Sequence, residues 1–74
     1  MVNLFVERLK ELISSSGKMQ KEICGDMKIS KQKLSKWKTG YSEPSIDEIL
    51  MIALYFDVTT DYLLGFEELK NNKG

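Results

Sequence analysis

The sequence predicts an all-α protein that forms one small domain of five helices. Apolar residues recur three and four positions apart, capping residues precede the apolar stretches, and the period-two alternation of a β-strand is absent. A chain of 74 residues is long enough for one domain, and its single proline, Pro44, falls between two predicted helices. We expect the domain to cover residues 1–70 and residues 71–74 to form a frayed tail.

The first two predicted helices lie before residue 28. Asn3 is a suitable cap for the first helix, and Gly17 can adopt the left-handed conformation that ends it. The apolar face of this helix consists of Phe5, Leu9, Leu12 and Ile13. The second helix is expected from about residue 19 to residue 27, with Ile23 and Met27 on its apolar side. Gly25 inside it costs about 0.5–1 kcal/mol relative to alanine.

The third predicted helix covers about residues 31–38. Ser30 precedes it and can accept a hydrogen bond from an amide of the first turn. Ile29 and Leu34 have the spacing of a hydrophobic staple, and Gly40 supplies the stop.

The fourth helix should begin after Ser45, which forms a capping box with Glu48. Its apolar residues cover so much of its circumference that we expect it to be largely buried. These residues are Ile46, Ile49, Leu50, Ile52, Ala53, Leu54 and Phe56. Thr59 caps a short fifth helix that Gly65 closes, and residues 66–70 are expected to form one more turn.

The charges are divided along the chain, although the net charge is zero. Residues 18–38 contain seven lysines and two acids, a balance of +5, whereas residues 39–74 contain two lysines and seven acids, a balance of −5. A polyanion responds to the local field, so the middle segment is suited to phosphate. The alternative is that these charges only keep a small protein in solution.

The third predicted helix has an apolar side and a side without acids. Leu34 and Trp37 fall within about 60° of each other and mark the core side. The other side, with its margins, consists of Lys31, Gln32, Lys33, Ser35 and Lys36. Glutamine can pair bidentately with adenine, and lysine can donate to guanine O6 and N7 or to phosphate. A solvated helix face is the alternative, but surface lysines are usually accompanied by glutamates at i,i+4, and here they are not.

Gln20 stands at the start of the second helix. Its amide and the unpaired N–H groups of the first turn can hold one phosphate together. It can equally be a solvated residue of the first turn.

Residues 20–37 resemble the helix-turn-helix of lambda-repressor-like proteins, the Cro/CI or xenobiotic-response-element type. The motif begins with a glutamine and has a small residue four positions later, matched by Gln20 and Cys24; its later apolar positions are matched by Leu34 and Trp37. The resemblance continues in WKTGYSEPS (37–45), IALYFDVT (52–59) and DYLLG (61–65), so that it covers about residues 4–66. Three positions depart from the pattern: Lys28 replaces the glycine of the turn, Gly25 replaces a helix former, and Lys38 stands where an acid is common.

The resemblance implies a five-helix domain that binds double-stranded DNA and regulates transcription, and we expect a repressor. Its third helix would lie in the major groove. Matched by position, the base-facing residues are Lys31, Gln32 and Lys36. The candidates for contacts to the DNA backbone are Gln20, Ser30, Lys33 and Tyr41. Because one recognition helix covers little DNA, we also expect a weak homodimer through the C-terminal third, whose available apolar residues are Tyr55, Tyr62, Leu64 and Phe66.

Two other functions compete with this one. The first is a protein-interaction module of the same fold, such as an antitoxin or adaptor. The second is an enzyme, which the sequence disfavours because there is no histidine, no nucleophile beside a base and no phosphate-binding loop. We expect no metal, no cofactor and no membrane span, and we expect Cys24 to be a buried, unreactive thiol in a cytoplasmic protein.

Overall fold

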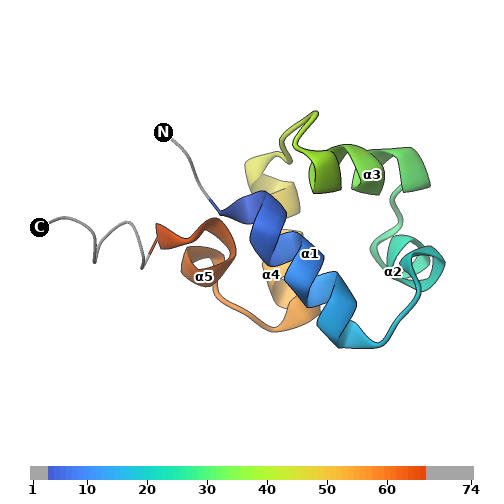
Figure 1. Ribbon diagram of the computed structural model, residues 1–74, viewed down its shortest axis with the longest axis horizontal. Coiled ribbons are helices and arrows are strands. Elements are labelled where there is room, and N and C mark those ends of the chain that lie inside the picture. The colour runs from blue at the N-terminus through green and yellow to red at the C-terminus, as the bar shows by residue number, and fades with distance from the viewer. Residues whose placement is uncertain (1–3, 67–74) are drawn as a thin grey trace, which may run out of the picture.

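The computed structural model describes residues 4–66, which form five α-helices and no strand. They are α1 (Phe5–Ser16), α2 (Gln20–Met27), α3 (Lys31–Thr39), α4 (Ile46–Phe56) and α5 (Thr60–Leu64). In Figure 1, α1 crosses in front of α4, with α2 and α3 on one side and α5 on the other. Helix α1 packs against both α3 and α5, while α2 packs against α3 and α4 against α5. The predicted all-α class is confirmed.

Three of the predicted side-chain caps are confirmed. The Ser30 hydroxyl accepts a hydrogen bond from the Lys33 amide at 3.0 Å, and the Thr59 hydroxyl accepts one from the Tyr62 amide at 3.0 Å. Ser45 and Glu48 form both halves of a capping box at the start of α4. Each of these caps satisfies an amide that the first turn of a helix leaves unpaired.

Helix α1 begins differently from the prediction. Its N-cap is Leu4, which makes no side-chain cap. The Leu4 amide instead donates to the Leu64 carbonyl at 3.1 Å and ties the start of α1 to the end of α5. At this crossing a Cβ on Gly65 would lie 2.7 Å from the Leu4 side chain, so space excludes a side chain here, and the φ of +76° also favours glycine. Asn3 itself, the turn expected after Phe66 and the tail at 71–74 lie outside the described residues.

The core draws side chains from all five helices. Its largest fully buried members are Leu9, Ile23, Leu34, Trp37, Ile52 and Leu63. Cys24 is also buried, as expected, and its thiol is free. The predicted apolar faces of α1, α2 and α3 therefore all turn inward, which matches the helical spacing of their apolar residues.

Helix α4 is not largely buried, contrary to the prediction. Ile52 and Ala53 face the core, but Ile46 is 80% exposed, Leu50 49% and Leu54 82%. The helix is apolar on two sides, and the other four helices cover only one of them. Apolar content alone predicts burial, but a domain of this size has too few elements to surround a central helix.

Lys28 joins α2 to α3 in a left-handed conformation, with φ 57° and ψ 47°. Gly25 lies within α2 with open space around a built Cβ, and its carbonyl accepts a hydrogen bond from the Lys28 amide at 3.3 Å. The turn therefore keeps its geometry, and Lys28 carries the strain that a glycine would avoid. A second left-handed residue, Asp57 (φ 56°), ends α4 and was not predicted.

We expect Lys28→Gly to raise the free energy of unfolding by about 1 kcal/mol, because it removes the left-handed strain. Chemical denaturation followed by circular dichroism measures the change. Lys21→Gly is the matched control: Lys21 is exposed within α2, so the same substitution should lower stability by about 0.5–1 kcal/mol. A loss of stability in both variants would show that Lys28 is not strained.

Candidate nucleic-acid interface

Helices α2 and α3 form a helix-turn-helix. The Ile29 amide donates to the Cys24 carbonyl at 3.0 Å and closes the turn between the helices. Cys24 itself is small and buried, which lets the two helices approach closely. Leu34 and Trp37 are at most 1% exposed, so they fix the inner side of α3 in the core. The outer side of α3 is thereby held in one orientation.

The three base-facing candidates are brought together on this outer side. Lys31, Gln32 and Lys36 are all exposed and lie within two turns of α3. No acidic residue occurs in α3. This surface presents hydrogen-bond donors that can reach base edges, and it carries no carboxylate to repel phosphate.

Two backbone-contact candidates lie at the ends of this surface. Ser30, before α3, is exposed; its oxygen accepts the helix cap, which leaves its O–H hydrogen available as a donor. Tyr41, after α3, is exposed, and the Lys36 ammonium lies 5.6 Å from the centre of its ring. Both hydroxyls are therefore exposed hydrogen-bond donors, one at each end of α3.

Lys33 has a different environment from the other lysines of α3. Its ammonium forms an ion pair with Glu48 of α4 and lies 5.9 Å from the centre of the Trp37 ring. The hydrogen bond from Lys33, followed by that from the Ser45 amide, holds the pKa of Glu48 below its usual value. A phosphate contact by Lys33 would thus have to compete with Glu48.

Gln20 is the first residue of α2 and is exposed. The residue before it, Met19, makes no side-chain cap, so no side chain of the described chain caps the amides at the start of α2. A negatively charged group is favoured at such a helix end by the helix dipole and by the open N–H groups.

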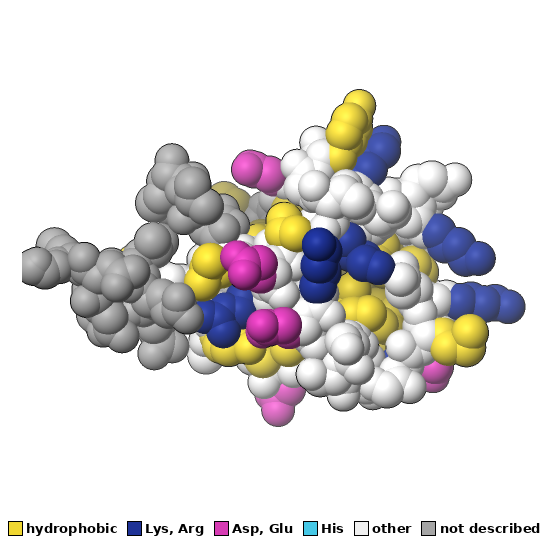
Figure 2. Space-filling view, viewed as in Figure 1, with side chains coloured by type: hydrophobic (Ala, Val, Ile, Leu, Met, Phe, Trp, Pro, Cys, Tyr) yellow, Lys and Arg dark blue, Asp and Glu magenta, His cyan; other side chains and the backbone are white. Residues whose placement is uncertain are grey.

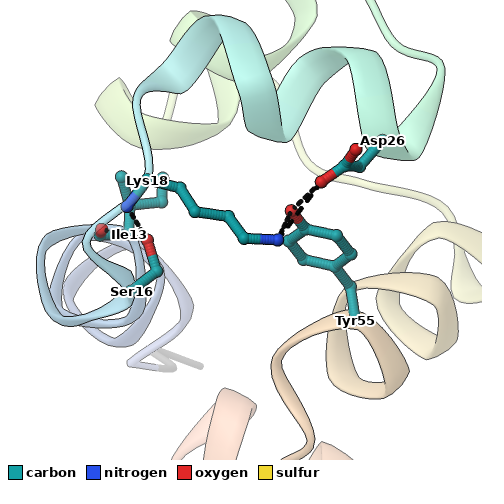
Figure 3. A network of polar contacts seen from close by, with 5 residues as sticks. All are labelled: Ile13, Ser16, Lys18, Asp26 and Tyr55. Carbon is teal, nitrogen blue, oxygen red and sulfur yellow. Dashed lines mark hydrogen bonds and ion pairs between the residues drawn. The ribbon is translucent and has the colours of Figure 1, made fainter.

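A polar network between α2 and α4 was not anticipated from the sequence (Figure 3). The Tyr55 hydroxyl of α4 donates to the Asp26 carboxylate of α2 at 2.6 Å. The Lys18 ammonium donates to both groups, at 3.1 Å to Tyr55 and 3.3 Å to Asp26. These bonds, from Tyr55 first, lower the pKa of Asp26, and they raise the pKa of Lys18. Asp26 and Tyr55 are 29 positions apart in the sequence, so no local sequence pattern indicates that they pair.

The basic and acidic side chains are separated in space as well as in sequence. On the face shown in Figure 2, most Lys and Arg side chains lie toward the α2–α3 side and most Asp and Glu toward the α5 side. Residues 39–66 contain five acids and no Lys or Arg. The basic residues of the described chain are therefore concentrated on the segment that contains the helix-turn-helix.

Other kinds of site find little support in the described part of the chain. Residues 4–66 bring no three His, Cys, Asp or Glu side chains together as a metal ion would require. Two surface hollows of about 290 and 360 Å³ lie beside Tyr55 and beside Gly25. None of α1 to α5 has the length and apolar content to cross a membrane.

Comparison with known proteins decides the family. Residues 6–69 match the profile of a family described as a helix-turn-helix domain. The chain belongs to this helix-turn-helix family. The membership confirms the resemblance found in the sequence, and it covers the same five helices.

Three relatives of this helix-turn-helix chain come from bacteria. It is 36% identical over 63 residues to the HTH-type transcriptional regulator ImmR of Bacillus subtilis. The aligned residues make up 85% of this chain and 50% of ImmR. It is 32% identical over 65 residues to the HTH-type transcriptional activator BcrR of Enterococcus faecalis, covering 88% of this chain and 32% of BcrR. A third relative is the SPbeta prophage-derived uncharacterized HTH-type transcriptional regulator YonR of B. subtilis, 31% identical over 61 residues, 82% of this chain and 56% of YonR. The chain thus spans between a third and just over half of these relatives.

We expect the Lys33–Glu48 pair to make stability depend on pH. Because the pKa of Glu48 is lowered in the folded state, its contribution is complete above the ordinary pKa of glutamate and is lost as the pH falls through the folded value. Glu48→Gln should therefore reduce the loss of thermal stability between neutral pH and acid. Glu43→Gln, an exposed loop residue with the same change of charge, is the control. Equal pH profiles for the wild type and Glu48→Gln would contradict the role of this pair.

Proposed function

We propose that this chain is a sequence-specific regulator of transcription that binds double-stranded DNA with α3 in the major groove. The observation that carries the proposal is the acid-free outer side of α3, whose inner side is locked by buried Leu34 and Trp37. The chain's membership of the helix-turn-helix family supports the proposal, as do its relatives, which are named as transcriptional regulators.

In this proposal the base contacts come from Lys31, Gln32 and Lys36. Gln32 lies at the centre of the outer side and pairs with adenine, while the two lysines donate to guanine. Gln20, Ser30, Lys33 and Tyr41 contact phosphates and set the register of α3 on the duplex. To contact a phosphate, the Lys33 ammonium either breaks its ion pair with Glu48 or binds Glu48 and the phosphate together.

We further propose that the chain acts as a repressor in the cytoplasm, as a weak homodimer and without a catalytic step. A domain seated in the major groove blocks its site by occupancy alone, which needs no further chemistry. One recognition helix of nine residues covers little DNA. A dimer would supply a second recognition helix, which could bind a second half-site.

A protein-interaction module, such as an antitoxin or adaptor, is the second candidate. The exposed apolar residues of α4 favour a protein contact. Electrophoretic mobility shift of duplex DNA by the purified chain, repeated at rising salt, distinguishes the two candidates. A regulator produces a shift that weakens with salt, whereas a module that binds only protein produces none.

We expect Gln32→Ala and Lys36→Ala each to weaken binding to the selected sequence by about 1–3 kcal/mol and to relax specificity at one base position. Sites are first selected from a random duplex pool, and affinities are then measured by fluorescence anisotropy on selected and scrambled duplexes. Lys10→Ala, an exposed lysine of α1, is the control and should change neither. An equal loss on both duplexes would show that these side chains contact only the DNA backbone.

We expect Lys33→Met to weaken binding to selected and scrambled DNA alike and to reduce the slope of log affinity against log salt by about 1. Methionine retains much of the apolar stem over Trp37 while removing the charge. If the slope is unchanged, Lys33 stays with Glu48 on DNA and makes no phosphate contact.

A further inference from the structure

Tyr41 is an exposed aromatic residue in the loop directly after the proposed recognition helix. Its side chain is 79% exposed and does not belong to the core or to the residues packed against it. The ring instead lies beside α3, with its centre 5.6 Å from the Lys36 ammonium. At this distance the negative face of an aromatic ring attracts a cation. Tyr41 therefore contacts one of the three lysines that are candidates for contacts to DNA on α3.

The backbone at the end of α3 brings these two side chains together. Gly40 is left-handed, with φ 77°, and its amide donates to the Trp37 carbonyl at 3.3 Å. The Tyr41 amide donates to the Lys36 carbonyl at 2.9 Å. This pair of hydrogen bonds is the Schellman motif, which places the side chains of the positions now held by Lys36 and Tyr41 against each other. The contact between ring and ammonium thus follows from the local fold of the chain.

We propose that the Tyr41 ring positions the Lys36 ammonium for its base contact, so that Tyr41 takes part in setting the sequence preference of the domain. The inference rests on the proposed function, in which Lys36 donates to guanine. It gives Tyr41 a role in addition to a phosphate contact by its hydroxyl. The two roles do not compete, because the face of the ring attracts the ammonium while the hydroxyl lies at the edge of the ring.

An aromatic ring suits a lysine that contacts a base better than a carboxylate does. Glu48 pairs with Lys33, and this pair neutralises the charge and uses an N–H donor of the lysine. The Tyr41 ring leaves the Lys36 charge in place and takes no conventional hydrogen bond from it. No acidic residue of the described chain forms an ion pair with Lys36. The Lys36 donors therefore remain available for guanine N7 and O6.

The ring also reduces the freedom that Lys36 has to lose on DNA. A long, flexible side chain pays an entropic cost when a base fixes it in one conformation, and this cost is smaller when the side chain is already ordered. Lys31 provides the comparison within the same helix, because no ring or carboxylate of the described residues contacts its ammonium. Tyr41 should consequently affect the base contact of Lys36 and leave that of Lys31 unchanged.

Nuclear magnetic resonance of the free protein tests the contact without DNA. The ring current of Tyr41 should shift the ε-methylene protons of Lys36 upfield in the wild type and in Tyr41→Phe. In Tyr41→Leu these protons should move to the position of the Lys31 ε-methylene protons. We expect an unchanged melting temperature for both variants, because the side chain is exposed and the Schellman bonds are made by the backbone. The same Lys36 shift in Tyr41→Leu as in the wild type would overturn the contact.

DNA binding tests the effect on specificity. Lys36→Ala first identifies the base pair at which discrimination is lost, and affinities are then compared between the selected duplex and one altered at that base pair. Tyr41→Leu should reduce the discrimination about two- to fivefold, the strength of an exposed cation–π contact. Tyr41→Phe should restore it, although loss of the hydroxyl weakens binding to both duplexes alike. Equal discrimination by the wild type and Tyr41→Leu would overturn the positioning role.

Double variants show whether Tyr41 acts through Lys36. In a Lys36→Ala background, Tyr41→Leu should cause no further loss of discrimination at the same base pair. At the base pair identified by Lys31→Ala, Tyr41→Leu should discriminate as the wild type does. A loss at both base pairs would show that Tyr41 supports α3 as a whole, which would overturn a specific role toward Lys36.

The outcomes separate this inference from the proposed function. If the wild type binds no duplex at any salt concentration, the proposed function is overturned, and the role of Tyr41 in base recognition with it. If the wild type binds the selected duplex specifically and Tyr41→Leu keeps the same base preference, only the inference about Tyr41 is overturned.

Discussion

The burial of Leu34 and Trp37 is the constraint on which the rest of the structure depends. These two side chains are the only apolar anchors of α3, and both are almost completely inaccessible. They determine which side of α3 faces outward, and hence which polar residues form the candidate DNA surface. A recognition helix needs this kind of fixation because a base contact tolerates little error in position.

Polar contacts between helices add to the packing of the core in fixing the positions of α2 and α3. The Lys33–Glu48 pair connects α3 to the start of α4, and the Lys18–Asp26–Tyr55 network connects α2 to the end of α4. Exposed ion pairs contribute little to stability singly. Here they have a positional effect, because α2 and α3 are both connected to α4.

Helix α4 therefore has two roles that its composition does not separate. Its inner side contributes Ile52 and Ala53 to the core, its polar groups hold the helix-turn-helix, and its outer side remains apolar and exposed. The charges follow the same division: the basic residues lie mainly on α2 and α3, and the acidic residues mainly on the part of the chain that includes α4.

The sequence by itself determined the class of fold, the helix boundaries to within about one or two residues, and the caps at Ser30, Ser45 and Thr59. These features depend on residues within a few positions of one another, where side-chain chemistry and backbone geometry act directly. It also predicted the exposed side of α3, because two anchors were enough to orient one helix. Only the tertiary structure decided that Lys33 pairs with Glu48, that Tyr55 bonds to Asp26, and that Ile46, Leu50 and Leu54 face solvent. Those outcomes depend on which helices lie against α4, and an apolar pattern specifies a side to be buried but not whether the chain has enough elements to cover it.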